Sequence, residues 1–201
     1  MKNKNGWTAL QIASQQQDTF ENFIKLIEKG ANLDAQNKNG WTALMLASQN
    51  KDCFENLVML IEAGANLDIQ EKHKKETALM LATRYGSFHQ VQELVSSGAD
   101  LDLVNYENNT ALMIALKHDK IDIASYLIIK GADVLIKDNE GLDAYNYVMK
   151  KGDLTLARMI EENVKKQFHK RKVASHQRGG RALQSSLKMK NQNTQLQDER
   201  E

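Results

Sequence analysis

The chain has 201 residues, of which 41% are hydrophobic and none is proline, so it is long enough for a core and favours uninterrupted helices. Its apolar runs are too short to span a bilayer, and we expect no secretory signal, because no charged stretch followed by an apolar one lies near Met1. The net charge of +1 hides an asymmetry: residues 1–162 hold 17 Lys and Arg against 23 Asp and Glu, whereas residues 163–190 hold nine Lys and Arg and no acid.

The octapeptide NKNGWTAL occurs at residues 3–10 and again at residues 37–44, and its Thr-Ala-Leu returns after Glu76 and after Asn109. The four threonines are 34, 35 and 33 residues apart, and a Gly-Ala-Asn or Gly-Ala-Asp recurs four times in step with them. A fifth, degraded copy begins near Asp138. This periodicity indicates repeated structural units. Their expected bounds are near 3–36, 37–71, 72–104, 105–137 and 138–168.

The threonine of each unit is expected to begin a first helix. Thr77 precedes the compact run Ala-Leu-Met-Leu-Ala, and its hydroxyl can accept a hydrogen bond from a free amide of the first turn. In the first copy Gln11 lies three residues after Thr8, which is the spacing of a capping box. In the unit at 72–104, we expect the first helix to end near Gly86.

A second helix is predicted to follow after a short turn. Ser87 and Gln90 have capping-box spacing, apolar residues then recur at helical spacing, and Gly98 can take the left-handed conformation that ends a helix. Acids lie at comparable places in the other units, and we interpret them as equivalent caps: Asp18 with Glu21, Asp52 with Glu55, Asp119 and Asp153.

Each unit is therefore a helix, a short turn, a second helix and a hairpin-like loop. No unit can bury its apolar faces alone, so the units must stack. Small residues five positions after each threonine would let the first helices approach closely: Ala13, Ala47, Ala82 and Ala115. The sequence predicts an all-α solenoid of about five units over residues 1–168.

The repeated segments TALQIA, TALMLA, TALMLA and TALMIA, together with GAN, GAN, GAD and GAD, resemble the ankyrin repeat family. The resemblance covers roughly residues 3–165 and implies a stack that binds proteins. The family's Pro is Ala here, which is the best helix former. The family's His, which ties loops of adjacent repeats by a hydrogen bond, is replaced by Gln11, Met45, Met80, Met113 and Asn146. We expect the methionines to fill apolar space instead.

The two ends of the array differ from its middle. The fifth copy loses the threonine and places Tyr145 and Tyr147 where Leu and Ile stand in other copies, as expected of a terminal unit. The first copy begins at the turn, with no extended segment before it. Three readings stay open: the stack lacks an N-terminal cap, it self-associates there, or the chain is a fragment of a longer array.

No catalytic constellation is visible in the sequence. Cys53 lies at the expected start of a second helix, where we interpret it as a packed cysteine, and a single cysteine suits a reducing, cytoplasmic compartment. The five histidines show no metal-binding spacing, and Gly179-Gly180 follows no strand that would make it a phosphate loop. We predict no enzyme activity, no cofactor, no metal site and no small-molecule substrate.

The ankyrin resemblance implies that partners bind on the concave side, at loop tips and first helices. These places are the positions four, three and one before each threonine and seven and eight after it. We call them the predicted binding face. It comprises Lys4, Asn5, Trp7, Gln15, Gln16, Lys38, Asn39, Trp41, Gln49, Asn50, His73, Lys74, Glu76, Arg84, Tyr85, Tyr106, Glu107, Asn109, Lys117, His118, Asn139, Glu140, Leu142, Lys150 and Lys151.

This face holds seven Lys and Arg against three acids, and it includes both tryptophans. Exposed Trp, Tyr and Arg are frequent interface hot spots. The alternative reading is that Trp7 and Trp41 only shield a loop against the neighbouring unit. We predict ten partner-binding residues: Lys38, Trp41, Asn50, His73, Lys74, Arg84, Tyr85, Tyr106, Lys117 and His118.

Residues 169–201 form a basic, polar tail that we expect to be disordered, because Gly179-Gly180 and its Gln, Asn and Ser content argue against a packed core. Our leading interpretation is a non-enzymatic module that binds a protein partner, with an acidic segment as one candidate, through the concave face. The alternative is a translocated effector or nuclear-targeted protein, in the host cytosol or nucleus, whose basic tail contacts nucleic acid or acidic membrane.

Overall fold

The computed structural model describes residues 2–16 and 20–166. Contacts divide the chain into two units, Met1–Ile160 and Glu161–Glu201, and every helix named below lies in the first. In the described ranges the regular structure is helical, with one isolated bridge between Lys2 and Thr8 and no extended strand. The predicted all-α repeat class is confirmed.

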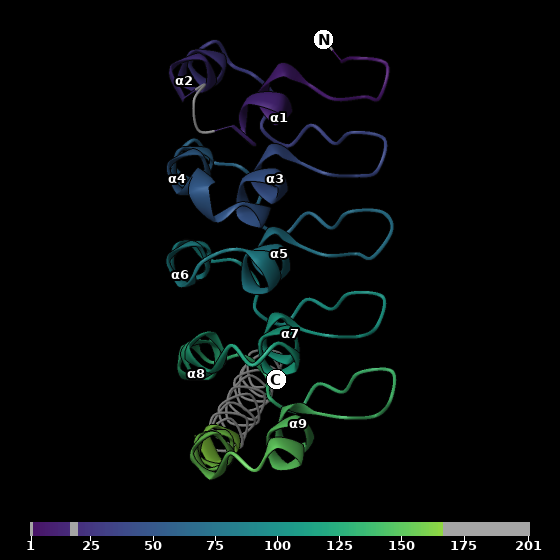
Figure 1. The fold of residues 1–201 in the computed structure, drawn as a ribbon, viewed down its shortest axis with the longest axis vertical. Coiled ribbons are helices and arrows are strands. Elements are labelled where there is room, and N and C mark those ends of the chain that lie inside the picture. The colour runs from purple at the N-terminus through teal and green to yellow at the C-terminus, as the bar shows by residue number, and fades with distance from the viewer. Residues whose placement is uncertain (1, 17–19, 167–201) are drawn as a thin grey trace, which may run out of the picture. The chain divides into compact units, whose positions relative to one another are not determined.

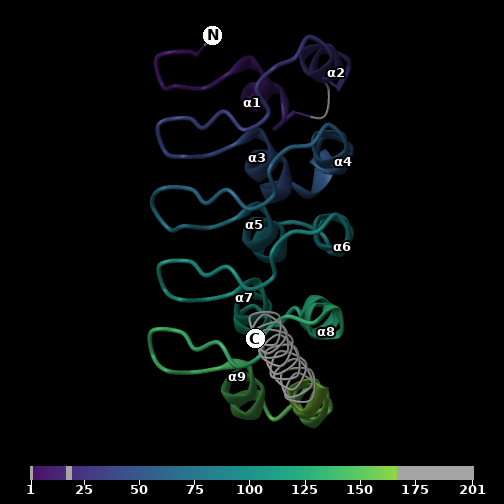
Figure 2. The ribbon, with the colours of Figure 1, turned by 180° about the vertical axis from the view of Figure 1, so that it is seen from behind.

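The helices alternate between two columns, with α1, α3, α5, α7 and α9 in one and α2, α4, α6 and α8 in the other (Figure 1). Long loops project on the far side of the first column, and the view from behind shows the same order (Figure 2). A 3-10 turn, Lys51–Cys53, precedes α4, and residues 154–160 are again helical. The bounds are α1 Ala9–Ala13, α2 Phe20–Glu28, α3 Ala43–Gln49, α4 Phe54–Glu62, α5 Ala78–Tyr85, α6 Phe88–Ser96, α7 Ala111–Lys117, α8 Ile121–Lys130 and α9 Ala144–Lys151.

The threonine caps predicted from the repeat are confirmed. The Thr77 hydroxyl accepts a hydrogen bond from the Met80 amide at 3.2 Å, and the corresponding bond forms at the other three threonines. The capping boxes at Thr8 and at Ser87 are both complete. Gly98 has a φ of 93° just after α6, as its place in the sequence predicts.

Two of the predicted acidic caps are wrong. Asn50, not Asp52, caps the second segment of its unit, because its Oδ1 accepts from the Asp52 amide at 3.1 Å and starts the 3-10 turn. Asp119 adopts a φ of 56°, so it ends the turn before α8 and does not cap it. The helix begins instead after Lys120, which makes no side-chain cap.

Asp153 does cap the last helical segment. Its Oδ1 accepts from the amides of Thr155 and Leu156 at 3.1 and 3.0 Å. The predicted cap at Asp18 lies outside the described residues, as do the predicted tail at 169–201 and the end of the fifth unit.

The core is a column of apolar side chains along the first helices, between them and the second helices. The methionines at the family's His position are buried, as predicted: Met45, Met80 and Met113. The small residues that let the first helices approach closely are buried as well: Ala13, Ala47, Ala82 and Ala115. The described part of the chain has no helix with the length and apolarity to span a bilayer.

Carbonyls at the ends of α1, α3, α5 and α7 accept hydrogen bonds from the next unit. The Gln90 side-chain amide donates to the carbonyls of Ala47 and Asn50 at 3.1 and 2.9 Å. The same two carbonyls also accept from the backbone amides of Asn50 and Cys53, at 3.2 and 3.1 Å, so the Gln90 side chain adds a second hydrogen bond to each. The donors at the four junctions are Asn56, Gln90, Lys120 and Lys151, so three residue types serve the same role.

A second set of bonds joins the units where the second helices end. Carboxylates of Asp34, Asp68 and Asp102 each accept from a backbone amide of the following unit, at 2.8, 2.9 and 2.7 Å. Burial raises the pKa of Asp102, with smaller opposing effects from its hydrogen bond. The acids of the Gly-Ala-Asp segments and their neighbours are therefore part of the scaffold.

Candidate functional site

The projecting loops owe their shape to one side chain at the start of each. Asn37 Oδ1 accepts hydrogen bonds from the amides of Asn39 and Trp41 at 2.9 and 3.1 Å. Asn3, Asn105 and Asp138 make the same pair of bonds in their own loops. Such a side chain mimics a backbone turn, which explains why the octapeptide begins with asparagine.

The glycine of the octapeptide is required by the neighbouring unit. Gly40 has a φ of 85°, and a Cβ there would lie 2.8 Å from the Lys72 amide nitrogen. Adjacent loop tips are this close because backbone bonds join them. The Lys72 amide donates to the Asn39 carbonyl at 3.0 Å, and the Tyr106 amide donates to the Lys74 carbonyl at 2.9 Å. The tips lie one above another along the stack (Figure 2).

The third loop is organised by Glu71 in place of asparagine. Its carboxylate accepts from the amides of His73, at 2.7 Å, and of Lys74, and it is only 3% exposed. A glutamate in a lysine-rich loop, EKHKKE, gives no sequence signal that it turns inward. The Glu71 carboxylate therefore faces inward and is not presented at the surface of the third loop.

The predicted binding face lies mostly at the surface. Of the ten predicted partner-binding residues, seven are exposed and Trp41, Asn50 and Arg84 are half-buried. Two members of the wider face are buried, so their predicted exposure is wrong. Glu76 is 3% exposed because it pairs with Arg84, and Asn109 is 1% exposed and donates to the Glu107 carboxylate at 2.8 Å.

Arg84 is held by partners inside the protein. One guanidinium nitrogen lies 2.5 Å from the Glu76 carboxylate and the other lies 3.0 Å from His118 Nε2. Burial lowers the pKa of His118, and the nearby charges of Arg84, Lys120 and Lys151 lower it further. The neutral ring can accept the Arg84 hydrogen bond at Nε2. Arg84 therefore joins α5 to α7 in the free protein.

Lys117 at the end of α7 also faces an internal carboxylate, with its Nζ 3.6 Å from Asp138. The Tyr147 hydroxyl donates to the same Asp138 oxygen. Burial alone would raise the pKa of Asp138, but the bonds from Tyr147 and two backbone amides, with the Lys117 charge, hold it below its ordinary value. Burial raises the pKa of Tyr147, and the hydrogen bond to Asp138 and the nearby acids raise it further.

Aromatic side chains on this face differ in exposure. Tyr85 is 48% exposed and Tyr106 is 56% exposed. Lys75 Nζ lies 5.2 Å from the centre of the Tyr106 ring, a cation–π distance. Trp7 and Trp41 are half-buried, so each has a smaller exposed fraction than either tyrosine.

Gln11 makes the tie that the resemblance assigns to histidine. Its side-chain amide donates to the carbonyls of Ala35 and Trp41 at 2.7 and 2.6 Å, while its oxygen accepts from the Thr8 amide. Gln11 thus both caps α1 and bonds the first unit to the start of the second. The sequence pattern indicated only the cap.

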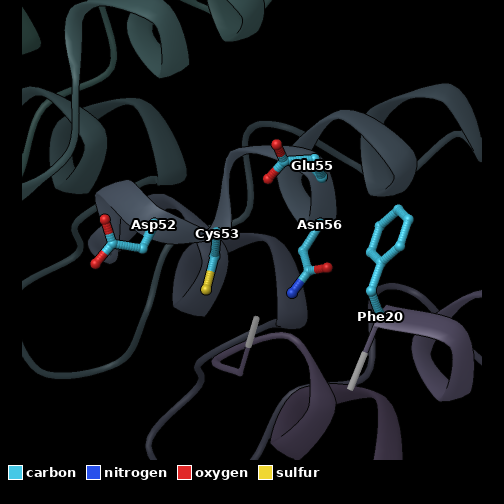
Figure 3. Close-up of a pocket in the computed structure, with 5 residues that line it drawn as sticks. All are labelled: Phe20, Asp52, Cys53, Glu55 and Asn56. Atoms are coloured by element: carbon cyan, nitrogen blue, oxygen red, sulfur yellow. The ribbon is translucent and has the colours of Figure 1, made fainter. Parts of the chain in front are cut away.

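A cavity of about 210 Å³ lies beside α4, lined by Phe20, Asp52, Cys53, Glu55 and Asn56 (Figure 3). The Cys53 thiol is 1% exposed, and burial, aided by Asp52 and Glu55, raises its pKa. These conditions disfavour the reactive thiolate. Within residues 2–16 and 20–166, no group of three or more His, Cys, Asp or Glu is arranged to hold a metal.

The family model for ankyrin repeats, in three copies, matches residues 1–71 and 55–138. The chain belongs to the ankyrin repeat family. None of the curated proteins compared with the chain matches it. Ankyrin repeats are in general modules for protein–protein interaction, and the joined loop tips described above are the part of this ankyrin stack that projects farthest from its helices (Figure 1).

Proposed function

We propose that this ankyrin repeat protein is a non-enzymatic module that binds a protein partner through the predicted binding face. The observation that carries the proposal is the exposure of Tyr85 and Tyr106 on neighbouring units of one face, 48% and 56% respectively. Large aromatic side chains with a polar tip supply contact area at interfaces with little loss of rotamer freedom. The accessible part of Trp41 adds a third aromatic group on the adjacent unit.

The rigidity of the face supports the same proposal. Side-chain bonds fix the loops internally, and backbone bonds join Asn39 to Lys72 and Lys74 to Tyr106 across units. A surface that is ordered before binding loses less conformational entropy when a partner docks. Ordered loop tips therefore favour binding over a purely structural role.

The test begins with an unbiased pull-down using the intact chain, followed by titration of the captured protein against variants. Tyr85→Ala and Trp41→Ala should each weaken binding by about 1–2 kcal/mol or more, as truncation of an interface anchor does. Glu62→Ala is the matched control, because Glu62 is exposed at the end of α4, outside the face. Parent-like binding of both aromatic variants would exclude this face.

The alternative function depends on residues 169–201, which lie outside the described part of the chain. A shortened chain that ends at residue 168 distinguishes the alternative from the proposed function. Partner binding that survives the deletion supports the repeat stack as the binding element. Binding or localisation that is lost with the tail supports a targeted protein whose basic tail contacts nucleic acid or acidic membrane.

A further inference from the structure

Three of the cations at the ends of the first helices already face carboxylates. Arg84 pairs with Glu76, Lys117 faces Asp138, and Lys151 pairs with Asp119. A partner carboxylate that approached these groups would compete with a negative charge already present. An anionic ligand therefore gains little from the helix ends, although they carry much of the positive charge counted from the sequence.

The loop tips of the second and third units are different. Both acids of the third loop, Glu71 and Glu76, are 3% exposed and occupied by internal bonds. The bases around them are exposed. We call these bases the loop-tip cluster: Lys38, Lys72, His73, Lys74 and Lys75.

Two contacts hold the cluster in place. Lys72 Nζ donates to the Lys38 carbonyl at 3.2 Å, which draws the two loops together. Lys75 lies over the Tyr106 ring, so the cluster ends beside an exposed aromatic surface. Four exposed lysines thus lie on two adjacent, bonded loop tips, and neither carboxylate of the third loop is exposed. Such an unbalanced positive patch attracts anionic ligands.

We infer that the loop-tip cluster binds a short acidic peptide segment of the partner, which lies across the second and third loops with an apolar side chain against Tyr106. The inference rests on the proposed function and names the chemistry of the partner. It predicts that Lys72 and Lys75, which lie outside the predicted binding face, contribute to binding.

The surroundings of the cluster favour a peptide over a nucleic acid or a membrane. Exposed Glu107 and Glu140 occupy the next two loop tips, so the positive surface ends after the third unit. Residues 1–162 as a whole carry six more acids than bases, from 23 against 17. A long polyanion or an anionic bilayer would meet these acids, whereas a segment of a few residues would not.

The test uses the full chain and a rhodamine-labelled hexaglutamate peptide that carries one tryptophan. Affinity is measured by fluorescence anisotropy at about 150 mM salt, where only close charges interact strongly. The double variant Lys72→Glu with Lys74→Glu should weaken binding at least about tenfold. The control, Lys29→Glu with Lys51→Glu, reverses the same charge at exposed sites outside the cluster and should change affinity less than about twofold.

Circular dichroism checks that each variant is folded. If the glutamate double variant does not fold, the double variant Lys72→Gln with Lys74→Gln is titrated in its place. Absence of peptide binding, or equal weakening in the control, would overturn the inference. Tighter binding of a single-stranded oligonucleotide or of phosphatidylserine vesicles through the same lysines would also overturn it.

The captured partner separates failure of this inference from failure of the proposed function. If its binding is weakened by Tyr85→Ala but not by the lysine reversals, the loop-tip inference fails and the interaction module stands. If its binding is insensitive to both sets of variants, the binding face itself is wrong.

Discussion

Leu79→Ala should destabilise the stack by about 3–5 kcal/mol, and Leu10→Ala, at the equivalent position of the first unit, should cost about half as much. Both leucines lie two residues after their capping threonine, and they are 1% and 2% exposed. The two variants therefore remove the same atoms from equally buried positions. The difference lies in the neighbours, because α5 packs against α3, α6 and α7, whereas α1 packs against α2 and α3.

The magnitude follows from two contributions. Loss of three buried carbon groups costs roughly 2–2.5 kcal/mol in transfer free energy. The cavity left between three packed helices adds roughly 1–2 kcal/mol, because the site cannot collapse freely. The structure around Leu10 can relax more easily, because Ile12 on the same helix is 44% exposed, whereas its counterpart on α5, Leu81, is 1% exposed. A terminal unit can also unfold without the rest of the stack.

Urea melts followed by two signals test this prediction. Circular dichroism reports the helices of all units, whereas both tryptophans, Trp7 and Trp41, report the first two. Leu10→Ala should move the fluorescence transition to lower urea than the dichroism transition, and Leu79→Ala should lower both. Equal losses for the two variants, or a loss under about 1 kcal/mol for Leu79→Ala, would refute the packing assigned to these helices.

Three further variants probe polar groups of the stack. Glu76→Ala should cost about 3 kcal/mol in a urea melt, because it leaves the Arg84 charge without its partner. Thr83→Val should raise stability by about 1 kcal/mol in the same assay, since the buried Thr83 hydroxyl has no hydrogen-bond partner. The depressed pKa of Asp138 stabilises the fold above the ordinary value of 3.8, and this stabilisation is lost as pH falls through the lower folded value. Asp138→Asn, which also weakens the bond from Tyr147, should flatten the loss of melting temperature on acidification, and an unchanged slope would contradict this role.

The local parts of the fold could be predicted from sequence because they depend on residues three or four positions apart. Thr8 with Gln11 and Ser87 with Gln90 are such pairs, and both formed as expected. The caps at Asp52 and Asp119 could not be predicted this way. The turn between the first and second helices varies in length among the units. In the second unit Asn50 comes before Asp52, and its side chain forms the cap instead.

The binding surface was harder to predict because charge on a loop depends on which way each side chain turns. Glu76 meets Arg84 only after α5 brings the two together, and Glu71 turns inward to bind loop amides. Lys72 and Lys75 are exposed for the opposite reason, because within residues 2–16 and 20–166 neither forms an ion pair with a carboxylate. The predicted binding face was assigned from the spacing of residues to each threonine. That assignment placed Glu76 on the surface and left out both of these lysines.

The carbonyl ties at the ends of the first helices give the repeats a fixed order. Gln90 bonds to Ala47 and Asn50, but the residue thirteen positions after the next threonine, as Gln90 is after Thr77, is Ile123. Exchanging α6 and α8 between their units would therefore remove the side-chain donor that bonds both carbonyls. Units that look interchangeable in sequence are matched to one neighbour each, so a shuffled or shortened array would be weakened at its new junctions even where every helix is unchanged.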